Sequence, residues 1–285
     1  MLGGAGPSWL HLRSDAVVGV GGGATTDLAG FVAATWLRGV RLVHVPTTVL
    51  GMADAAVGQD GHQHPRRGQE PRGLPSTRPP ACFCDLDALR SLPAVDVAAG
   101  LAEVAKVGFT SDPVVLELVE ADAAAAVDVE GDVLRELIER AVRVKAEVVS
   151  DDLRESRPGG LGREVLNYGH TFGHAVENVE HYTWRHGHAV SVGLVFVAAL
   201  ARLAGRLDAG DAARHGEILR SLGLPTAYAA GRFPALLDAM RIDKKSRGDQ
   251  LRFVVLDAIG SPGLLEGPDL SLVEAAYDEV SEVAP

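Results

Sequence analysis

The chain has 285 residues, of which 47% are hydrophobic, and a formal net charge of -11. This is enough apolar material for one or two domains, and the acidic balance argues against a nucleic-acid-binding surface. The sequence has no uninterrupted run of 18 apolar residues and no secretory signal pattern, and Cys82 and Cys84 lie too close together for a disulfide framework. We therefore expect a cytoplasmic protein with no nucleic-acid or membrane partner.

The first elements along the chain have the layout of a nucleotide site. Residues 15–20 form an apolar run typical of a buried strand, a glycine triplet follows at 21–23, and residues 28–36 have helical character. A strand, a glycine turn and a helix N-terminus together direct backbone N–H groups at a phosphate. A second strand, residues 41–45, ends in two threonines, at the strand end where open α/β sheets bind ligands. The glycine triplet alone is weak evidence, because many tight turns look alike.

Residues 59–83 differ from their surroundings. They hold five of the chain's 15 prolines, several arginines and glycines, and no apolar periodicity. This composition is typical of a loop or a disordered insert.

From residue 95 onward the pattern is mainly helical. Apolar residues recur at helical spacing over residues 134–149, and a long apolar helix is expected over 190–203. Residues 251–256 look like a strand of a small hairpin, and residues 272–283 like a charged amphipathic helix.

Residues 166–177 (LNYGHTFGHAVE) carry the strongest chemical signal. His170 and His174 are four residues apart, so on a helix both imidazoles project from one face. His186 follows and Glu103 lies upstream, and two imidazoles on one face are the usual start of a divalent-metal site. The alternative is a pair on a helix surface with no shared role, but the glycine-rich composition around the pair is poor for a surface helix and favours the metal site.

Taken together and in this order, the motifs resemble 3-dehydroquinate synthase and the related sugar-phosphate cyclases. The matching motifs are GGGxxxD at 21–27, GFxAAxxxRG at 30–39, PTTxL at 46–50, DxxVG at 54–58, LP at 92–93, GLAEVxK at 100–106, LNYGHTFGHAxE at 166–177, HGxAVxxG at 186–193 and DKK at 243–245. The resemblance implies a Rossmann-like NAD-binding α/β domain over residues 1–94, disrupted at 59–83, and an all-helical metal- and substrate-binding domain over 95–285. The family has further strand–helix units before the glycine turn, so we expect the first domain to be incomplete.

The resemblance also implies site residues. It assigns Zn²⁺ or Co²⁺ to Glu103, His170 and His186, and NAD to Gly21, Gly22, Gly23, Ala24, Asp27, Thr47, Thr48 and Ser91. It implies catalytic or substrate-binding roles for Arg38, Asp54, Lys106, Lys145, Arg163, Asn167, His174, Lys244 and Lys245. One carboxylate and two imidazoles leave coordination positions open for substrate oxygens, as a catalytic zinc site needs.

Family members convert a seven-carbon phosphorylated keto acid, DAHP, into 3-dehydroquinate and phosphate in the shikimate pathway, with NAD regenerated in each turnover. The expected partner is therefore a small molecule, and a homodimer stays open. Three alternatives remain: a sister cyclase acting on another sugar phosphate, a metal-dependent polyol dehydrogenase, which would have no use for Lys106 and Arg163, and an inactive truncated remnant.

The odd segment at 59–83 has an explanation in the genetic code. At this place the family carries Gly-Lys-Thr-Gly-Ile-Asn and then Gly-Lys-Asn, whose lysines and asparagine serve cofactor and substrate. Residues 59–64 (QDGHQH) can be encoded as CAAGACGGGCATCAACAC, and this string, with GG before it and C after it, also reads Gly-Lys-Thr-Gly-Ile-Asn-Thr in a shifted frame. Our hypothesis is that residues 59–83 are an out-of-frame reading of the gene.

We predict that resequencing the locus will reveal a frame change near each end of this segment and a lysine-containing motif between them. The third bases of the codons above were free choices, so compatibility alone does not decide the matter. A clean open frame that encodes residues 59–83 as printed would refute the hypothesis.

Overall fold

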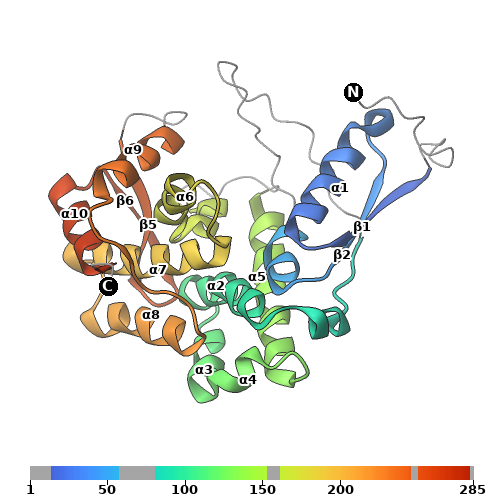
Figure 1. Ribbon diagram of the computed structural model, residues 1–285, viewed down its shortest axis with the longest axis horizontal. Coiled ribbons are helices and arrows are strands. Elements are labelled where there is room, and N and C mark those ends of the chain that lie inside the picture. The colour runs from blue at the N-terminus through green and yellow to red at the C-terminus, as the bar shows by residue number, and fades with distance from the viewer. Residues whose placement is uncertain (1–13, 58–80, 153–160, 245–249, 283–285) are drawn as a thin grey trace.

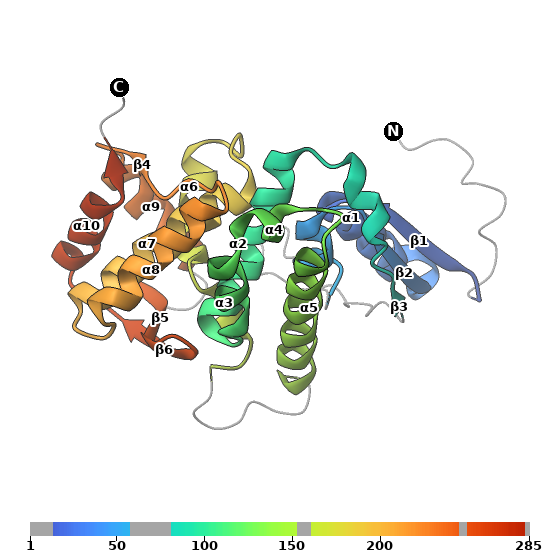
Figure 2. The same cartoon turned by 90° about the horizontal axis from the view of Figure 1, so that it is seen from below.

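The computed structural model describes residues 14–57, 81–152, 161–244 and 250–282. A small parallel sheet with one helix occupies one end of the molecule, and helices with a β-hairpin occupy the other, as Figures 1 and 2 show from two directions. Helices α2 (Ala94–Thr110) and α5 (Asp132–Asp152) lie between the two ends. Both contact the short π-helical turn η2 (Gly51–Ala55).

The α/β end confirms the strand, glycine turn and helix expected from the sequence, but the strand is not buried as expected: Val18 and Val20 are each 58% exposed. Strand β1 (Ala16–Gly21) leads through Gly22 directly into α1 (Gly23–Thr35), which begins at the glycine triplet, before the apolar stretch that signalled it. The short helix η1 (Trp36–Arg38) then leads to β2 (Arg41–Pro46), which pairs in parallel with β1 along its whole length. A small cluster of buried side chains, from Ala29 to Leu42, joins α1 to the sheet.

The expectation of a loop throughout residues 59–83 is wrong at its end. Ala81 and Cys82 form the short strand β3 (Ala81–Cys82), paired in parallel with β2, and the Phe83 N–H donates to the His44 carbonyl at 2.8 Å. Backbone pairing beside an existing strand depends little on side-chain periodicity, so composition could not signal it. Residues 58–80 lie outside the described residues.

The helical character expected from residue 95 onward is confirmed. The remaining helices are η3 (Leu86–Ser91), α3 (Val114–Ala121), α4 (Ala123–Val127), η4 (Gly162–Asn167), α6 (His170–Val179), α7 (His186–Leu203), α8 (Ala209–Ser221), α9 (Phe233–Lys244) and α10 (Leu270–Glu279). Strands β5 (Arg252–Ala258) and β6 (Ser261–Glu266) form the expected antiparallel hairpin. Strands β4 (Tyr228–Ala229) and β7 (Ser281–Glu282) add a short parallel pair that the sequence did not predict.

Helix α7 is the centre of the helical part. It packs against α2, α6, α8, α10 and β5, and most of its side chains are buried. By length and hydropathy alone it could cross a membrane, and it is the one helix in the described ranges that passes this test. Because 72% of it is buried inside the protein, its hydropathy is explained by its place in the core.

Close packing around α7 depends on glycine. A Cβ on Gly193 would lie 2.1 Å from the carbonyl oxygen of Gly169, in the turn that leads into α6. Gly169 itself has a φ of +78°, a conformation that favours glycine. The two glycines therefore let the start of α6, which carries His170, approach the side of α7.

We predict that Gly193→Ala lowers the free energy of unfolding by about 1–3 kcal/mol, because the new methyl group meets backbone that cannot move aside. Urea unfolding measures the change. The matched control is Gly210→Ala in the first turn of α8, where the added Cβ meets only the Asp208 carboxylate, at 3.1 Å. The control should be neutral or stabilising, since alanine is the better helix former. Equal stability of both variants would contradict the packing argument.

Candidate active site

The site is built around Glu103, a carboxylate buried on α2. Its side chain is 2% exposed, and Lys106, one turn later on the same helix, pairs with its Oε2. The Lys106 ammonium also donates to the Leu166 carbonyl oxygen at 2.8 Å, which ties α2 to η4. Lys106 therefore forms an ion pair with Glu103 inside the candidate site.

Two imidazoles face the other oxygen of Glu103. His170 and His186 are the first residues of α6 and α7, and their Nε2 atoms lie 3.3 and 3.4 Å from Glu103 Oε1. This oxygen is buried and accepts no hydrogen bond. The three ligand atoms lie within 4.8 Å of one another. A buried carboxylate oxygen without a hydrogen bond, facing two imidazole nitrogens, fits a bound divalent cation.

Each histidine is oriented through its other nitrogen. His170 Nδ1 lies 3.1 Å from the Tyr168 carbonyl oxygen, and His186 Nδ1 lies 3.1 Å from Glu177 Oε1. An acceptor at Nδ1 leaves the Nε2 lone pair free for a metal, which is the usual outer-shell arrangement of metal-binding histidines. The sequence interpretation missed Glu177, although its position three residues after His174 on α6 was a usable signal.

The electrostatics of the pocket favour a cation. Burial alone would raise the pKa of Glu103, but Lys106 and His170 outweigh it, and the pKa lies well below its usual range. Burial would likewise lower the pKa of His186, but the adjacent carboxylates of Glu103 and Glu177 raise the pKa to about 10. The carboxylates thus hold positive charge at the position where the two imidazoles converge.

A second ion pair joins the helical part to η2. The Lys145 ammonium, on α5, donates to the Asp54 carbonyl oxygen at 2.7 Å and also pairs with the Asp54 carboxylate. Burial would raise the pKa of Asp54, but Lys145 overrides it and the pKa is lowered. The charges of Glu103 and Lys106 also act on Asp54, so these four residues form one electrostatic cluster.

The residues expected to bind the nucleotide meet at the ends of β1 and β2. The Thr47 N–H donates to the Gly21 carbonyl oxygen at 2.9 Å, and a Cβ on Gly22 would lie 3.2 Å from Thr48 Cγ2. Gly22 is the N-cap of α1, and no side chain caps that helix. Ala24 lies in the first turn of α1 and Asp27 one turn later. A helix N-terminus beside a cradle without Cβ atoms fits a dinucleotide phosphate.

The other expected residues are less closely grouped. The His174 ring lies near both ligand histidines, with ring centroids 5.2 Å from His170 and 6.0 Å from His186. Arg163 and Asn167 lie on η4, whose Leu166 contacts Lys106. Elsewhere in the described ranges, Arg38 lies exposed on η1 and Ser91 at the exposed end of η3. The side chain of Lys244 and all of Lys245 fall outside the described residues.

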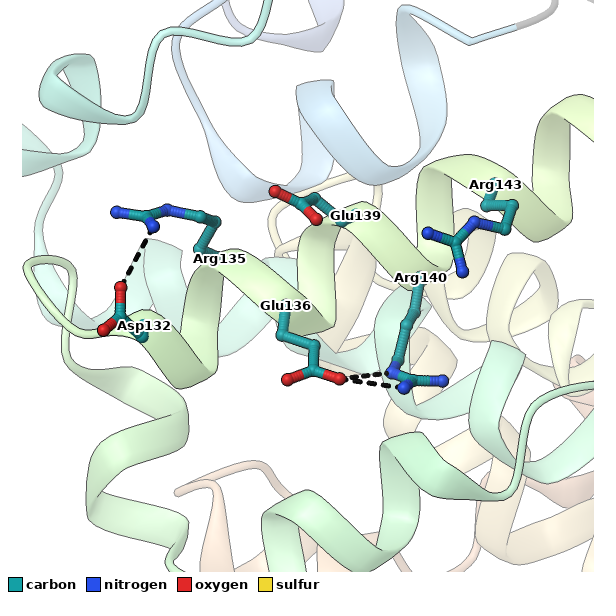
Figure 3. Close-up of a pocket in the computed structure, with 6 residues that line it drawn as sticks. All are labelled: Asp132, Arg135, Glu136, Glu139, Arg140 and Arg143. Carbon is teal, nitrogen blue, oxygen red and sulfur yellow. Dashed lines mark hydrogen bonds and ion pairs between the residues drawn. The ribbon is translucent and has the colours of Figure 1, made fainter.

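A surface hollow on α5 is a weaker candidate site. Figure 3 shows its lining, in which Arg135 pairs with Asp132 at 3.0 Å and Arg140 pairs with Glu136 at 2.8 Å. These pairs join residues three or four positions apart on one helix, which is typical of a solvated helix face. We assign no ligand to this hollow.

Comparison with known families identifies the family of the chain. Residues 9–99 match the family model described as 3-dehydroquinate synthase N-terminal, and residues 100–246 match the one described as 3-dehydroquinate synthase C-terminal. The chain belongs to the 3-dehydroquinate synthase family. The resemblance stated from the motifs is therefore confirmed.

Individual relatives agree with the family models. The chain is 60% identical over 274 residues to 3-dehydroquinate synthase of Thermobifida fusca (strain YX), covering 96% of this chain and 73% of that protein. It is 58% identical over 271 residues to 3-dehydroquinate synthase of Streptomyces coelicolor, covering 95% of this chain and 73% of that protein.

Solved structures confirm the fold class. The chain resembles 2-epi-5-epi-valiolone synthase from Streptomyces hygroscopicus subsp. jinggangensis with NAD⁺ and Zn²⁺ bound, with a TM-score of 0.80 and 26% identity over 92% of this chain and 72% of that one. It also resembles 2-deoxy-scyllo-inosose synthase complexed with carbaglucose-6-phosphate, NAD⁺ and Co²⁺, with a TM-score of 0.79 and 26% identity over 94% and 74% of the two chains. A probable glycerol dehydrogenase from Sinorhizobium meliloti, at 21% identity and a TM-score of 0.61, shares the fold alone.

We predict that the purified protein binds about one Zn²⁺ or Co²⁺ per chain, and that Glu103→Gln, His170→Ala and His186→Ala each abolish this binding. Metal analysis after dialysis measures the stoichiometry. The matched control is His181→Ala, which removes an imidazole from the turn that follows α6. Unchanged metal content in all three site variants would exclude the proposed ligands.

Proposed function

We propose that this protein is a 3-dehydroquinate synthase that converts DAHP into 3-dehydroquinate and phosphate, with NAD and a divalent metal as cofactors. The observation that carries the proposal is the converging set Glu103, His170 and His186 beside the buried Lys106 and Lys145 ammonium groups. It occurs in a chain about 60% identical to named 3-dehydroquinate synthases.

The cationic groups suit a substrate that carries a phosphate and a carboxylate. Lys106 and Lys145 are nearly buried, so water screens their charges little. In our proposal they leave their present partners in part and donate charge-assisted hydrogen bonds to substrate oxygens. Arg163 would add a planar fork for one of the anionic groups.

When bound, NAD supplies a hydride acceptor and the metal lowers the pKa of a coordinated hydroxyl. The glycine turn and Thr48 would fix the cofactor at the carboxyl ends of β1 and β2. His174, exposed at the mouth of the site and beside both ligand histidines, is the group we propose to exchange protons with the substrate. The Asp54–Lys145 pair would hold the part of the protein that binds the cofactor in a fixed position relative to the part that binds the substrate.

The residue inventory separates the proposal from its alternatives. A polyol dehydrogenase needs the glycine turn and the metal but not two buried lysines beside them. A sister cyclase would share every one of these features, so the identity of the product decides. Chromatographic detection of 3-dehydroquinate, together with release of phosphate, would support the proposal, and a different carbocycle would support a sister cyclase.

We predict that the chain as printed releases phosphate from DAHP slowly or not at all. A version with the frame restored over residues 59–83 and with the family's upstream strand–helix units added should be active. Losing two charge-assisted contacts from the transition state, each worth about 1.5–3 kcal/mol, slows turnover by roughly two to four orders of magnitude. Phosphate release with NAD and Zn²⁺ present measures both versions under identical conditions.

The control for this comparison is Lys106→Met in the restored version, which should lose activity although its frame is correct. Rapid turnover by the printed chain would overturn the frame hypothesis and the roles given to the missing lysines. Inactivity of both versions, with metal and NAD bound, would count against DAHP as the substrate.

A further inference from the structure

A buried histidine outside the metal site is connected to one of its ligands. His215, on α8, is fully buried, and its Nε2 lies 2.8 Å from the hydroxyl of Tyr168, which is also fully buried. The ring of Phe109 stacks on the His215 imidazole, with centroids 3.7 Å apart and planes 9° from parallel. Phe109 belongs to α2, the helix that carries Glu103.

The partners of His215 fix its tautomer. Its Nδ1 lies 2.8 Å from the Asp211 carbonyl oxygen, which can only accept, so Nδ1 carries the hydrogen. Nε2 is then an acceptor, and the Tyr168 hydroxyl donates to it. Burial lowers the pKa of His215 to about 4, so the ring is neutral and both nitrogens are satisfied. The ring thus has one orientation and one hydrogen-bond role for each nitrogen.

Tyr168 connects the fixed His215 ring to the candidate metal site. Its hydroxyl is held by α8, and its carbonyl oxygen faces His170 Nδ1 at 3.1 Å. Gly169, the one residue between them, turns the chain with a φ of +78° and packs against Leu194 of α7. A tilt of the Tyr168 residue would therefore move the acceptor that directs His170 Nε2 toward Glu103.

We propose that His215 is a positioning residue for the metal ligand His170 and acts through Tyr168. The proposal rests on the metal site of the proposed function and assigns a purpose to a polar pair in the core. A buried tyrosine–histidine pair needs both partners, since losing one leaves the other unsatisfied. Outer-shell partners of metal-binding histidines typically change metal affinity by about 10- to 100-fold when removed.

The test compares two tyrosine hydroxyls. Tyr168→Phe removes the hydroxyl that His215 holds and leaves the ring and the backbone carbonyl in place. Tyr277→Phe is the matched control, because the Tyr277 hydroxyl is also buried and also bridges two groups, the Ala229 carbonyl oxygen at 2.7 Å and the Arg232 N–H at 2.9 Å. Both variants should lower Tm by a similar amount. Only Tyr168→Phe should weaken Co²⁺ and Zn²⁺ binding, by about 10-fold, the low end of the range for direct partners, because the carbonyl oxygen that contacts His170 stays in place.

The measurements are the metal dissociation constants, by chelator competition, and the visible absorption spectrum of the Co²⁺-loaded full chain. His215→Gln and His215→Phe extend the test, because glutamine can still accept from Tyr168 and phenylalanine cannot. We expect His215→Gln to keep more of the metal affinity and a Co²⁺ spectrum closer to that of the unsubstituted protein. This comparison decides the proposal if Tyr168→Phe fails to fold.

Unchanged metal affinity and spectrum in Tyr168→Phe and His215→Phe, with a lowered Tm, would reduce the pair to core packing and overturn the proposal. That outcome would leave the metal site itself intact. Absence of metal binding by the unsubstituted protein would instead overturn the ligand set and this proposal together.

Discussion

The site depends on the burial of one carboxylate. Glu103 is 2% exposed, and an isolated carboxylate in such a place would take up a proton. Lys106 satisfies one of its oxygens, and the other is left without a hydrogen bond between two imidazoles. A buried carboxylate requires positive charge or hydrogen-bond donors beside it. The requirement explains why charged and polar side chains gather here, in the middle of an otherwise apolar core.

The candidate ligands meet because two helices begin beside the middle of a third. His170 and His186 are the first residues of α6 and α7, and both side chains reach Glu103, in the middle of α2. A Cβ on Gly187, the residue after His186, would lie 1.7 Å from the Ala99 carbonyl oxygen, so α7 touches the backbone of α2 directly. The absence of a side chain at Gly187 thus lets α7 pack against α2, and this packing places the neighbouring His186 beside Glu103. Metal geometry and core packing cannot be changed separately in this region.

The sequence could predict features that depend on neighbouring residues or that belong to a motif of the family. The strand and glycine turn of β1 and α1, the helical spacing of His170 and His174, and the hairpin of β5 and β6 all follow from short-range rules. The spacing alone could not decide whether His174 is a metal ligand, because both members of an i,i+4 pair lie on one side of the helix. Only the distances between side chains in the folded chain distinguish a ligand from its neighbour. The pairs Lys145–Asp54 and Tyr168–His215 join residues 91 and 47 positions apart, so only the folded chain reveals them. Strand β3 was not predicted for a related reason, since its pairing with β2 is made by backbone atoms.

If the proposed function holds, the charge balance of the cluster would let an acidic protein bind an anionic substrate. The pKa values of Glu103, Asp54 and Glu177 are all lowered, so these three groups are carboxylates, and Lys106 and Lys145 offset two of them. The Glu103 and Glu177 carboxylates raise the pKa of His186 to about 10, so without a metal a protonated His186 would offset the third. A divalent cation held by Glu103, His170 and His186 would require a neutral imidazole and would displace that proton. Replacing that proton, with one positive charge, by a divalent cation, with two, would leave the cluster with a net positive charge. The formal net charge of the whole chain is -11. Affinity for phosphate and carboxylate groups should therefore appear together with the metal, because the lysines alone are already neutralised by their carboxylate partners.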